Sequence, residues 1–451
     1  MVAPMNTKKN ILILYDQHEI HVKTISDYLQ SFHRYSRHNI SYVSSFAKCR
    51  FDLDYFDAVV VHNSVRVCYP GPLSPSFAQA LKNYQGLKVL FIQDEYDNTN
   101  FAKRTILDLG IGLIFTCVPE ASIAKVYPPE EFAQVKFVNV LTGFIPLKLS
   151  QLKTYAPIRQ RSVLIGYRGR NIGFWYGDLG QEKRQIGMHM KKICKQRRLK
   201  ADIAWEEGDR IYGNGWFDFL GKCKATLGTE SGANVFDFDG TLKSTVQAEL
   251  RRNPKATYEE IHDKFLSERE GEIVMNQISP KVFEAIACRT ALVLFEGRYS
   301  GVLQPDLHYL SLKKDFSNVD EVLAKLHDDT LLEAMAGRAY ADIIGSGRYT
   351  YQAFVNQVDE ALERNWRPKL REQPSWLPLP PCDALPAFRD AYRKNFEPHA
   401  LSRAWQRMPG FVQAAINRDR FKRMWYALPE PFRMVFQPLL PRLRSLAKPA
   451  H

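Results

Sequence analysis

The first 146 residues alternate short apolar runs with segments whose apolar residues recur at helical spacing. The central residues of several runs, such as 58–61, 89–92 and 111–115, contain no polar side chain, which predicts strands buried on both faces of a parallel sheet. The segment 21–32 between the first two runs has the spacing of an amphipathic helix. Alternation of strands and helices predicts a doubly wound domain. The predicted strands are 10–16, 40–43, 56–62, 87–94, 111–117 and 135–140.

The same pattern starts again after a segment rich in proline and polar residues. The run "RSVLIGYRG" (161–169) predicts a strand that ends in a glycine turn, and the predicted strands after it are 201–205, 224–230, 290–296 and 308–312. The fold class is therefore α/β, with two doubly wound Rossmann-like domains that face each other across a cleft. The boundaries that we infer are a first domain at 1–146, a linker at 147–160, a second domain at 161–348, a closing helix at 349–366, a proline-rich connector at 367–388 and a basic amphipathic tail at 389–451.

The net charge of +13 is unevenly distributed over the 451 residues. From residue 401 onward there are ten Lys and Arg against two Asp and Glu, and the difference of +8 is more than half of the total. A basic tail on a nearly neutral body favours a local anionic partner over general nucleic-acid binding. We therefore expect the tail to contact an anionic membrane surface, and we expect no nucleic-acid partner.

The spacing of the cysteines and the length of the apolar segments indicate the cellular compartment in which the protein is expected. The seven cysteines form no C-x-x-C pair and lie mostly in apolar runs, which favours reduced thiols over disulfides or a zinc site. The N-terminal segment lacks the pattern of a signal peptide, and no stretch approaches 18 apolar residues. We expect a cytoplasmic protein with peripheral contact to the inner face of the membrane.

The stretch "ANVFDFDGTLKS" (233–244) contains Asp237 and Asp239 in the Asp-x-Asp-Gly-Thr pattern that opens haloacid-dehalogenase-type phosphatases. It also contains the Asp-x-Asp pair of a metal-dependent glycosyltransferase class. A phosphatase nucleophile follows a buried strand, whereas turn-forming residues precede Asp237. We predict instead a loop in which these acids accept hydrogen bonds from backbone amides.

The segment 276–328 carries a resemblance to a known family. It contains Ser279, Lys281 and Glu284 in "NQISPKVFEAIACRTALVLFEG", followed by the loop Tyr299–Gly301. This arrangement resembles the donor-binding half of GT-B glycosyltransferases, most closely the spore-maturation CgeB-like or glycosyl transferase group 1 branch. The segments 164–183 and 226–243 are similar to that branch as well. The resemblance covers about residues 160–365. The first domain agrees with it in architecture only.

Two positions depart from the family pattern. Asn276 stands where many retaining members have a glutamate that holds the sugar, and Arg289 stands where a glycine usually follows the helix. The resemblance therefore leaves open whether transfer inverts or retains the anomeric configuration.

Pro280 and Lys281 are predicted in the first turn of a helix, where free backbone amides attract a pyrophosphate and Lys281 adds a full charge. Glu284 lies one turn later on the same face. The resemblance implies that Glu284 accepts hydrogen bonds from the ribose hydroxyls of the nucleotide. Arg168 and Arg170 follow the first strand of the second domain, where a guanidinium can bind a diphosphate without metal.

Two further loops complete the predicted donor site. Glu230 and Ser231 follow a predicted strand and are placed near the donor sugar. Ser300 and Gly301 belong to the small loop that the resemblance assigns to the same site. No metal ligand and no other cofactor is expected.

The acceptor and a catalytic base are expected in the first domain. An inverting transferase needs a general base that removes the proton of the acceptor hydroxyl, whereas a retaining one does not. Our first choices for a base or acceptor contact are Asp16 and His18, because the first strand–helix loop borders the cleft in this fold. Other strand ends offer His62, Asp94 and Glu95.

The sequence thus predicts a metal-independent glycosyltransferase that moves a sugar from a nucleotide-sugar to a glycan or lipid-linked acceptor, in surface polysaccharide synthesis. Two alternatives remain open. Sugar-nucleotide epimerases share the two-domain fold. The departures at Asn276 and Arg289 also fit a catalytically degenerate nucleotide-binding or scaffold subunit.

Overall fold

A computed structural model describes residues 8–20, 22–152 and 155–367. The proline-rich connector beyond residue 367 and the basic tail at 389–451 lie outside the described residues, so the membrane prediction for the tail stays a prediction. No helix in the described part of the chain is long and apolar enough to cross a membrane.

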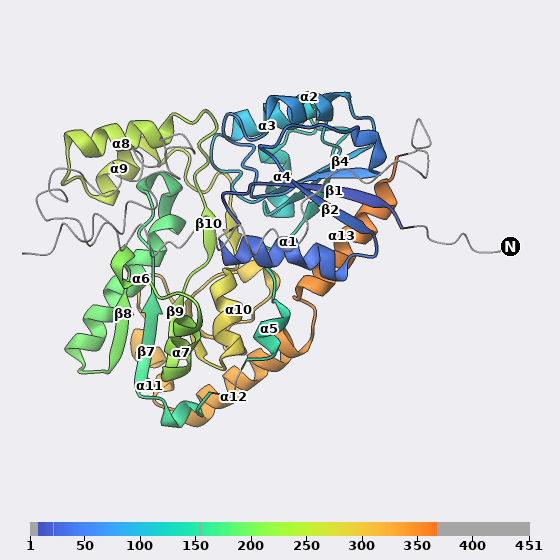
Figure 1. The fold of residues 1–451 in the computed structure, drawn as a ribbon. Coiled ribbons are helices and arrows are strands. Elements are labelled where there is room, and N and C mark those ends of the chain that lie inside the picture. Colours follow the sequence, from blue (N-terminus) through green and yellow to red (C-terminus); the bar gives the residue numbers. More distant parts are fainter. Residues whose placement is uncertain (1–7, 21, 153–154, 368–451) are drawn as a thin grey trace, which may run out of the picture. The chain divides into compact units, whose positions relative to one another are not determined.

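The first sheet has six parallel strands in the order β2-β1-β3-β4-β5-β6 (Figure 1). All six predicted strands are present: β1 (Asn10–Tyr15), β2 (Asn39–Ser44), β3 (Ala58–Val61), β4 (Leu87–Ile92), β5 (Leu113–Thr116) and β6 (Lys136–Asn139). The interior strands β3, β4 and β5 are mostly apolar and are buried at every position, including the polar Lys88 of β4 and Thr116 of β5. Helices connect the strands: α1 (Lys23–Tyr35), α2 (Pro75–Asn83), α3 (Thr99–Leu109) and α4 (Glu120–Val126).

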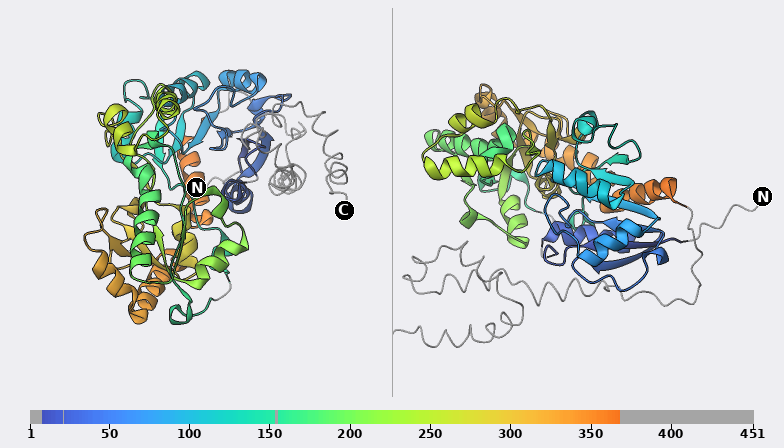
Figure 2. Two further views of the ribbon diagram at one scale, coloured as in Figure 1. Left: turned by 90° about the vertical axis from the view of Figure 1, so that its left-hand side faces the viewer. Right: turned by 90° about the horizontal axis from the view of Figure 1, so that it is seen from above.

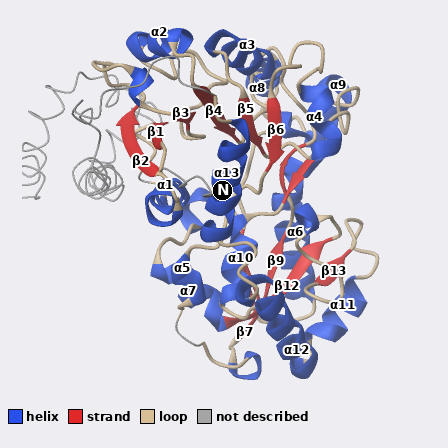
Figure 3. Ribbon diagram, turned by 90° about the vertical axis from the view of Figure 1, so that its right-hand side faces the viewer, coloured by secondary structure: helices blue, strands red, loops and turns tan. Residues whose placement is uncertain are grey.

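The second sheet has five parallel strands in the order β13-β12-β9-β7-β8, and Figure 3 shows them with helices around them. Its strands are β7 (Val163–Arg168), β8 (Ala201–Ala204), β9 (Cys223–Gly228), β12 (Ala291–Phe295) and β13 (Leu310–Leu312). Its helices are α6 (Gly177–Gln196), α7 (Asn214–Lys222), α10 (Pro280–Ala287), α11 (Val319–Leu326) and α12 (Asp329–Ala339), the last continued by a π-helical turn at Tyr340–Gly345. The predicted fold class of two Rossmann-like parallel sheets is confirmed.

Each sheet reverses its strand order once. In the first sheet β1 lies between β2 and β3, and in the second β7 lies between β8 and β9. The chain therefore runs from β1 to β2 on one side and then crosses to β3 on the other side of β1. It runs in the same way from β7 to β8 and then to β9. The crevice beyond the carboxyl ends of the two strands at such a point is where ligands bind in open α/β sheets.

Residues 229–278 form an excursion that the sequence pattern did not predict as elements. A two-stranded antiparallel ribbon pairs β10 (Ser231–Ala233) with β11 (Met275–Gln277). Between these strands lie α8 (Leu242–Arg252) and α9 (Tyr258–Phe265), which pack on a small cluster of buried apolar residues of their own. The excursion touches the first half of the chain, because the Gln277 amide donates to the Cys117 carbonyl at 2.6 Å.

The predicted closing helix is α13 (Tyr351–Asn365), and it packs beside the first sheet rather than the second. Figures 1 and 2 show this helix, in orange, next to the blue α1. Its Asp359 is buried and accepts hydrogen bonds from the Ser36 hydroxyl and the Arg37 backbone amide, at 2.8 and 2.7 Å. Phe354 packs edge-on against Tyr28 of α1. The last helix among the described residues thus returns to the first domain. A short helix, α5 (Leu147–Ser150), lies in the predicted linker.

Candidate active site

A cavity of about 220 Å³ lies at the strand-order reversal of the second sheet. Its walls include Arg168 and Gly169 at the carboxyl end of β7, and Gly228 and Thr229 at the end of β9. The first turn of α10 supplies Lys281 to the same cavity. The cavity therefore lies where the topology alone places a ligand site.

Of the residues that the structure describes, five with cationic side chains and none with a carboxylate line this cavity. The five are Arg168, Arg170, Lys183, Arg210 and Lys281. Arg168, Arg170 and Lys281 belong to the predicted donor site, and the structure brings them together. Anions with several charged oxygens, such as diphosphates, are the ligands that such a field attracts.

Most donors of Arg168 are already engaged within the protein. Its guanidinium donates to the backbone carbonyls of Tyr167, Asp202 and Asp209 at 2.9–3.1 Å, and it pairs with the Asp202 carboxylate at 2.8 Å. It also stacks over the Phe219 ring at 4.4 Å. These contacts use four of the five N–H groups of an arginine. Arg168 therefore acts mainly as a structural group at the edge of the cavity.

Arg170 and Lys183 are the least engaged of the five cations. Within the described residues, the side chains of Arg170 and Lys183 make no hydrogen bond or ion pair. Arg170 is exposed, whereas Lys183 is partly buried. Burial, together with the charges of Lys281 and Arg170, lowers the pKa of Lys183 to about 8. An anion that binds here therefore meets two cations that need not break an existing ion pair.

The cavity also contains two cations that the sequence did not predict, Lys183 and Arg210. Lys183 lies in the first half of α6, where a lysine is usually a solvated surface residue, and only the packing of the β7–α6 loop places it at the cavity. Arg210 pairs with Glu207 at 2.9 Å in a loop that the apolar pattern does not define. A count of basic residues near the ends of β7 and β8 was the one sequence feature that could have indicated them.

The first turn of α10 has the predicted composition. Pro280 is its first residue, and the Lys281 ammonium donates to the Arg168 carbonyl at 3.0 Å. Glu284 does not line the cavity itself: its Oε2 accepts a hydrogen bond from the Trp216 indole at 2.8 Å, and Trp216 lines the wall. Burial raises the pKa of Glu284, while the Trp216 hydrogen bond and Lys281 oppose this shift. Glu284 is thus a partly buried carboxylate directly behind the cavity wall.

The other predicted donor residues form a separate cluster around Glu230. Its buried carboxylate accepts hydrogen bonds from the Asn276 amide at 2.8 Å and the Tyr299 backbone amide at 2.6 Å. The Ser300 hydroxyl donates to Gln277 Oε1 at 3.0 Å. A glutamate at position 276 would place a second carboxylate against Glu230, whereas Asn276 offers a donor.

Ser231 lies in β10, opposite Gln277, and neither it nor Glu230 lines the cationic cavity. Gly301 is exposed, with a φ of +73° that glycine adopts without strain. The predicted donor set is therefore divided between the cationic cavity and the loop cluster around Glu230, and the roles predicted for the cluster stay predictions.

In the first domain, Asp16 and His18 lie in the loop after β1. Asp16 Oδ1 accepts the His18 backbone amide at 2.7 Å, and the Asp16 amide donates to the Ser64 hydroxyl at 3.0 Å. Asp16 thus ties the ends of β1 and β3 together, and His18 is exposed. Neither residue lines the nearby cavity of about 220 Å³, whose walls include Glu19 and Asp94.

The remaining candidates for a general base differ in whether a ligand can reach their side chains. His62 is fully buried, and burial lowers its pKa to about 3, so it is a neutral core histidine. Glu95 is fully buried too, and burial raises its pKa to about 7. Asp94 lines the first-domain cavity and pairs with Arg66 at 3.4 Å. Of these three residues, only Asp94 can contact a ligand.

In the Asp-x-Asp-Gly-Thr stretch, Asp237 accepts backbone amides as predicted, whereas Asp239 accepts a side-chain amide instead. The two carboxylate oxygens of Asp237 accept the backbone amides of Leu242 and Lys243, each at 3.1 Å, at the start of α8. Asp239 accepts a hydrogen bond from the Asn100 amide of α3 at 2.7 Å. Both acids are thus used in holding the excursion, and the strand before them is the three-residue β10, which is buried only at Ala233.

Comparisons with known proteins concern structure alone, since a scan against protein-family models and a search of curated proteins both found no match. Among solved structures, an α-glucosyltransferase in complex with UDP and a 13-mer DNA shares 10% identity, with a TM-score of 0.45 over 80% of this chain and 100% of that chain. HepE of Anabaena in complex with UDP and glucose gives 10% identity and a TM-score of 0.45, over 79% of this chain and 100% of that chain.

Sucrose-phosphate synthase from Thermosynechococcus elongatus shares 9% identity, with a TM-score of 0.42 over 79% of this chain and 99% of that chain. The fold assignment of this protein rests on its own sheet topology and not on these likenesses. The resemblance to the CgeB-like branch stays a prediction.

Proposed function

We propose that this protein is a glycosyltransferase that binds a nucleotide-sugar in the second domain and transfers the sugar to a glycan or lipid-linked acceptor. The observation that carries the proposal is the cationic cavity at the β7–β9 reversal, with the first turn of α10 in its wall. Arg170 and Lys183, which have no ion-pair partner among the described residues, and a helix N-terminus supply a positive field for a diphosphate without a metal ion.

Within this proposal, Arg170, Lys183 and Lys281 bind the diphosphate, and Arg168 holds the β7 end in place. Glu284 accepts the ribose hydroxyls as the sequence resemblance implies, and this requires the Trp216 indole to share or give up its hydrogen bond. Lys148 of the linker and Asp27 of α1 lie close enough to influence the charge of Glu284. The nucleoside would therefore extend from the cavity toward the first domain.

The acceptor is proposed for the cavity of the first domain, beyond the ends of β1, β3 and β4. Its lining is mainly polar and includes Asn63, Gln93 and the carboxylates of Glu19 and Asp94. Such groups suit a ligand with many hydroxyls. Asp94 joins Asp16 and His18 as a candidate general base, and an acceptor glycan or a lipid-linked saccharide fits the predicted pathway of surface polysaccharide synthesis.

A two-step assay tests the proposal. Nucleotide-sugars are first ranked by the thermal shift that they produce, because a ligand that binds only the folded state raises its stability. The best donor is then incubated with glycan, lipid-linked and DNA acceptors, and both free nucleoside diphosphate and glycosylated product are quantified. DNA is included because one similar structure was solved with it.

Release of nucleoside diphosphate that depends on an acceptor supports the transferase. Release without any acceptor product would favour the epimerase or a hydrolase. No shift with any nucleotide would favour the scaffold.

A further inference from the structure

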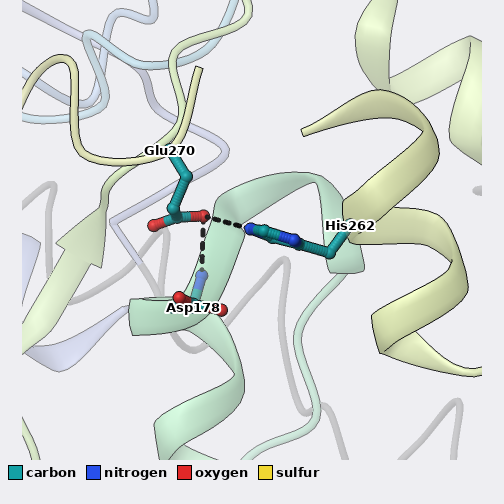
Figure 4. A group of neighbouring side chains, drawn as sticks. All are labelled: Asp178, His262 and Glu270. Carbon is teal, nitrogen blue, oxygen red and sulfur yellow. Dashed lines mark hydrogen bonds and ion pairs between the residues drawn. The ribbon is translucent and has the colours of Figure 1, made fainter. Parts of the chain in front are cut away.

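Three side chains with metal-binding atoms meet outside the cationic cavity (Figure 4). They are Asp178 at the start of α6, His262 of α9 and Glu270 of the loop that precedes β11. Their ligand atoms all lie within 4.8 Å of one another, and none of the three lines the donor cavity. The cluster joins the excursion between β10 and β11 to the helix that carries Lys183.

Glu270 presents one engaged and one unpartnered oxygen. Its Oε2 accepts the Asp178 backbone amide at 3.1 Å, and its Oε1 is buried without a hydrogen-bond partner among the described residues. Gly177 has a φ of +74°, and a Cβ there would lie 2.4 Å from Oε2, so glycine permits this close approach. The neighbouring Asn234 side chain lies close enough to favour the charged form of the Glu270 carboxyl, and its own Oδ1 is buried without a hydrogen-bond partner among the described residues. A buried oxygen without a donor is costly, which points to a cation as its partner.

His262 is oriented to offer a lone pair to the same point. Its Nδ1 lies 3.5 Å from the Asp263 carboxylate, and its Nε2 lies 3.8 Å from Glu270 Oε2. A proton on Nδ1 that faces Asp263 leaves Nε2 as an acceptor, and Nε2 is buried without a hydrogen-bond partner in the described part of the chain. A carboxylate behind the imidazole is the usual second partner of a metal-binding histidine.

Asp178 completes the set. The Tyr258 hydroxyl donates to its Oδ1 at 2.7 Å, which fixes the carboxylate and leaves Oδ2 for a ligand. Zinc bonds of about 2.0–2.2 Å place tetrahedral ligands about 3.4 Å apart, so the 3.8 Å pair is close to this spacing. Because all ligand atoms lie within 4.8 Å of one another, the tetrahedral spacing requires side-chain shifts of at most about 1.4 Å.

The geometry points to a structural site for a divalent transition metal of the zinc type, held by Asp178, His262 and Glu270. One imidazole with two carboxylates favours Zn²⁺ over Mg²⁺ or Ca²⁺, which prefer oxygen ligands alone. The ion would fasten α9 to the first turn of α6. This differs from the sequence prediction that no metal is bound, and it leaves the donor cavity metal-free.

The test uses the full chain, stripped of metal with a chelator and dialysed. Zn²⁺, Mn²⁺, Mg²⁺ and Ca²⁺ are then added separately, with metal content measured by mass spectrometry and stability by thermal melting. We expect one Zn²⁺ per chain and a melting temperature raised by a few degrees, with no shift for Mg²⁺ or Ca²⁺.

His262→Gln and Glu270→Gln should each weaken Zn²⁺ binding at least tenfold, whereas Glu259→Gln, an exposed carboxylate on the same helix, should not. Asp178→Asn is the second variant if those two fail to fold, because Asp178 is exposed. It should bind Zn²⁺ more weakly and still bind nucleoside diphosphate normally. A wild-type protein that retains no Zn²⁺ and does not respond to it would overturn the inference and leave a plain His262–Glu270 ion pair. Equal zinc retention by all variants would overturn it as well.

Discussion

Arg168 and Arg170 lie two residues apart at the same cavity, and we expect opposite consequences when each is replaced by alanine. Arg170 is exposed and has no partner among the described residues, so Arg170→Ala should leave the melting temperature unchanged. It should remove charge-assisted hydrogen bonds to the diphosphate, which are worth about 1.5–3 kcal/mol. Affinity for a nucleoside diphosphate should therefore fall about 10- to 150-fold.

Arg168→Ala should instead lower stability. The Arg168 side chain is 14% exposed and donates to three backbone carbonyls, which contribute about 1 kcal/mol each. Its partner Asp202 is 49% exposed, so the ion pair adds less than about 1 kcal/mol. Water can form hydrogen bonds to some of the carbonyls that Arg168 no longer reaches. We therefore expect a net loss of about 2–3 kcal/mol in the free energy of unfolding, visible as a melting temperature several degrees lower.

Calorimetric titration with a nucleoside diphosphate and thermal melting of both variants measure these effects. Arg364→Ala, an exposed arginine of α13 that pairs only with Glu360 among the described residues, is the matched control and should change neither quantity. The assignment is refuted if Arg170→Ala binds as tightly as the wild type, or if Arg168→Ala melts normally and loses binding.

Further expectations follow from three other features. Lys183 has a pKa of about 8 that a bound diphosphate would raise, so binding takes up a proton and affinity should fall as pH rises through 8; Lys183→Met should flatten this dependence in titrations between pH 7 and 9.5. Asp237→Asn should destabilise the protein by about 1–2 kcal/mol, because one of the amides of Leu242 and Lys243 loses its acceptor. Pure protein should show no magnesium-dependent phosphatase activity, and an activity abolished by Asp237→Asn would contradict this. Removal of the chain after about residue 390 should reduce sedimentation with anionic liposomes, and equal pelleting of both forms would exclude a membrane role for the tail.

The architecture was predictable because short, mostly apolar runs define buried parallel strands. Residues 58–61 and 87–92 are buried throughout, as a sheet covered on both faces demands. By contrast, α8 buries only Leu242 and Val246, so its apolar stripe is too narrow to indicate a helix in the sequence. The three-residue strands β10 and β11 are too short for a periodicity. The amphipathic face of α13 predicted a packed helix but could not name α1 as its partner.

The site residues were predictable where their place at a helix start or a strand end determines that they reach the cavity. Helix-start residues such as Lys281 and strand-end residues such as Arg170 reach the cavity because the topology places them there. Whether an arginine is already paired depends on distant segments: Arg168 bonds to the carbonyl of Asp209, 41 residues later. Arg289 illustrates the same limit, since its φ of +50° lies in the region that favours glycine, the residue that the sequence resemblance implies there, and its guanidinium stacks over Tyr340 at 4.0 Å.

The most direct test of the donor site is the affinity of a nucleoside diphosphate for wild-type, Glu284→Ala and Glu284→Gln proteins, measured by calorimetry in EDTA. The account predicts that the wild type binds without added metal and that Glu284→Ala binds at least tenfold more weakly with little change in melting temperature. Glu284→Gln, which keeps one acceptor for a ribose hydroxyl, should lie between them. Wild-type binding that disappears in EDTA while the protein stays folded, or a Glu284→Ala variant that binds normally, would contradict the placement of the nucleotide in the second domain.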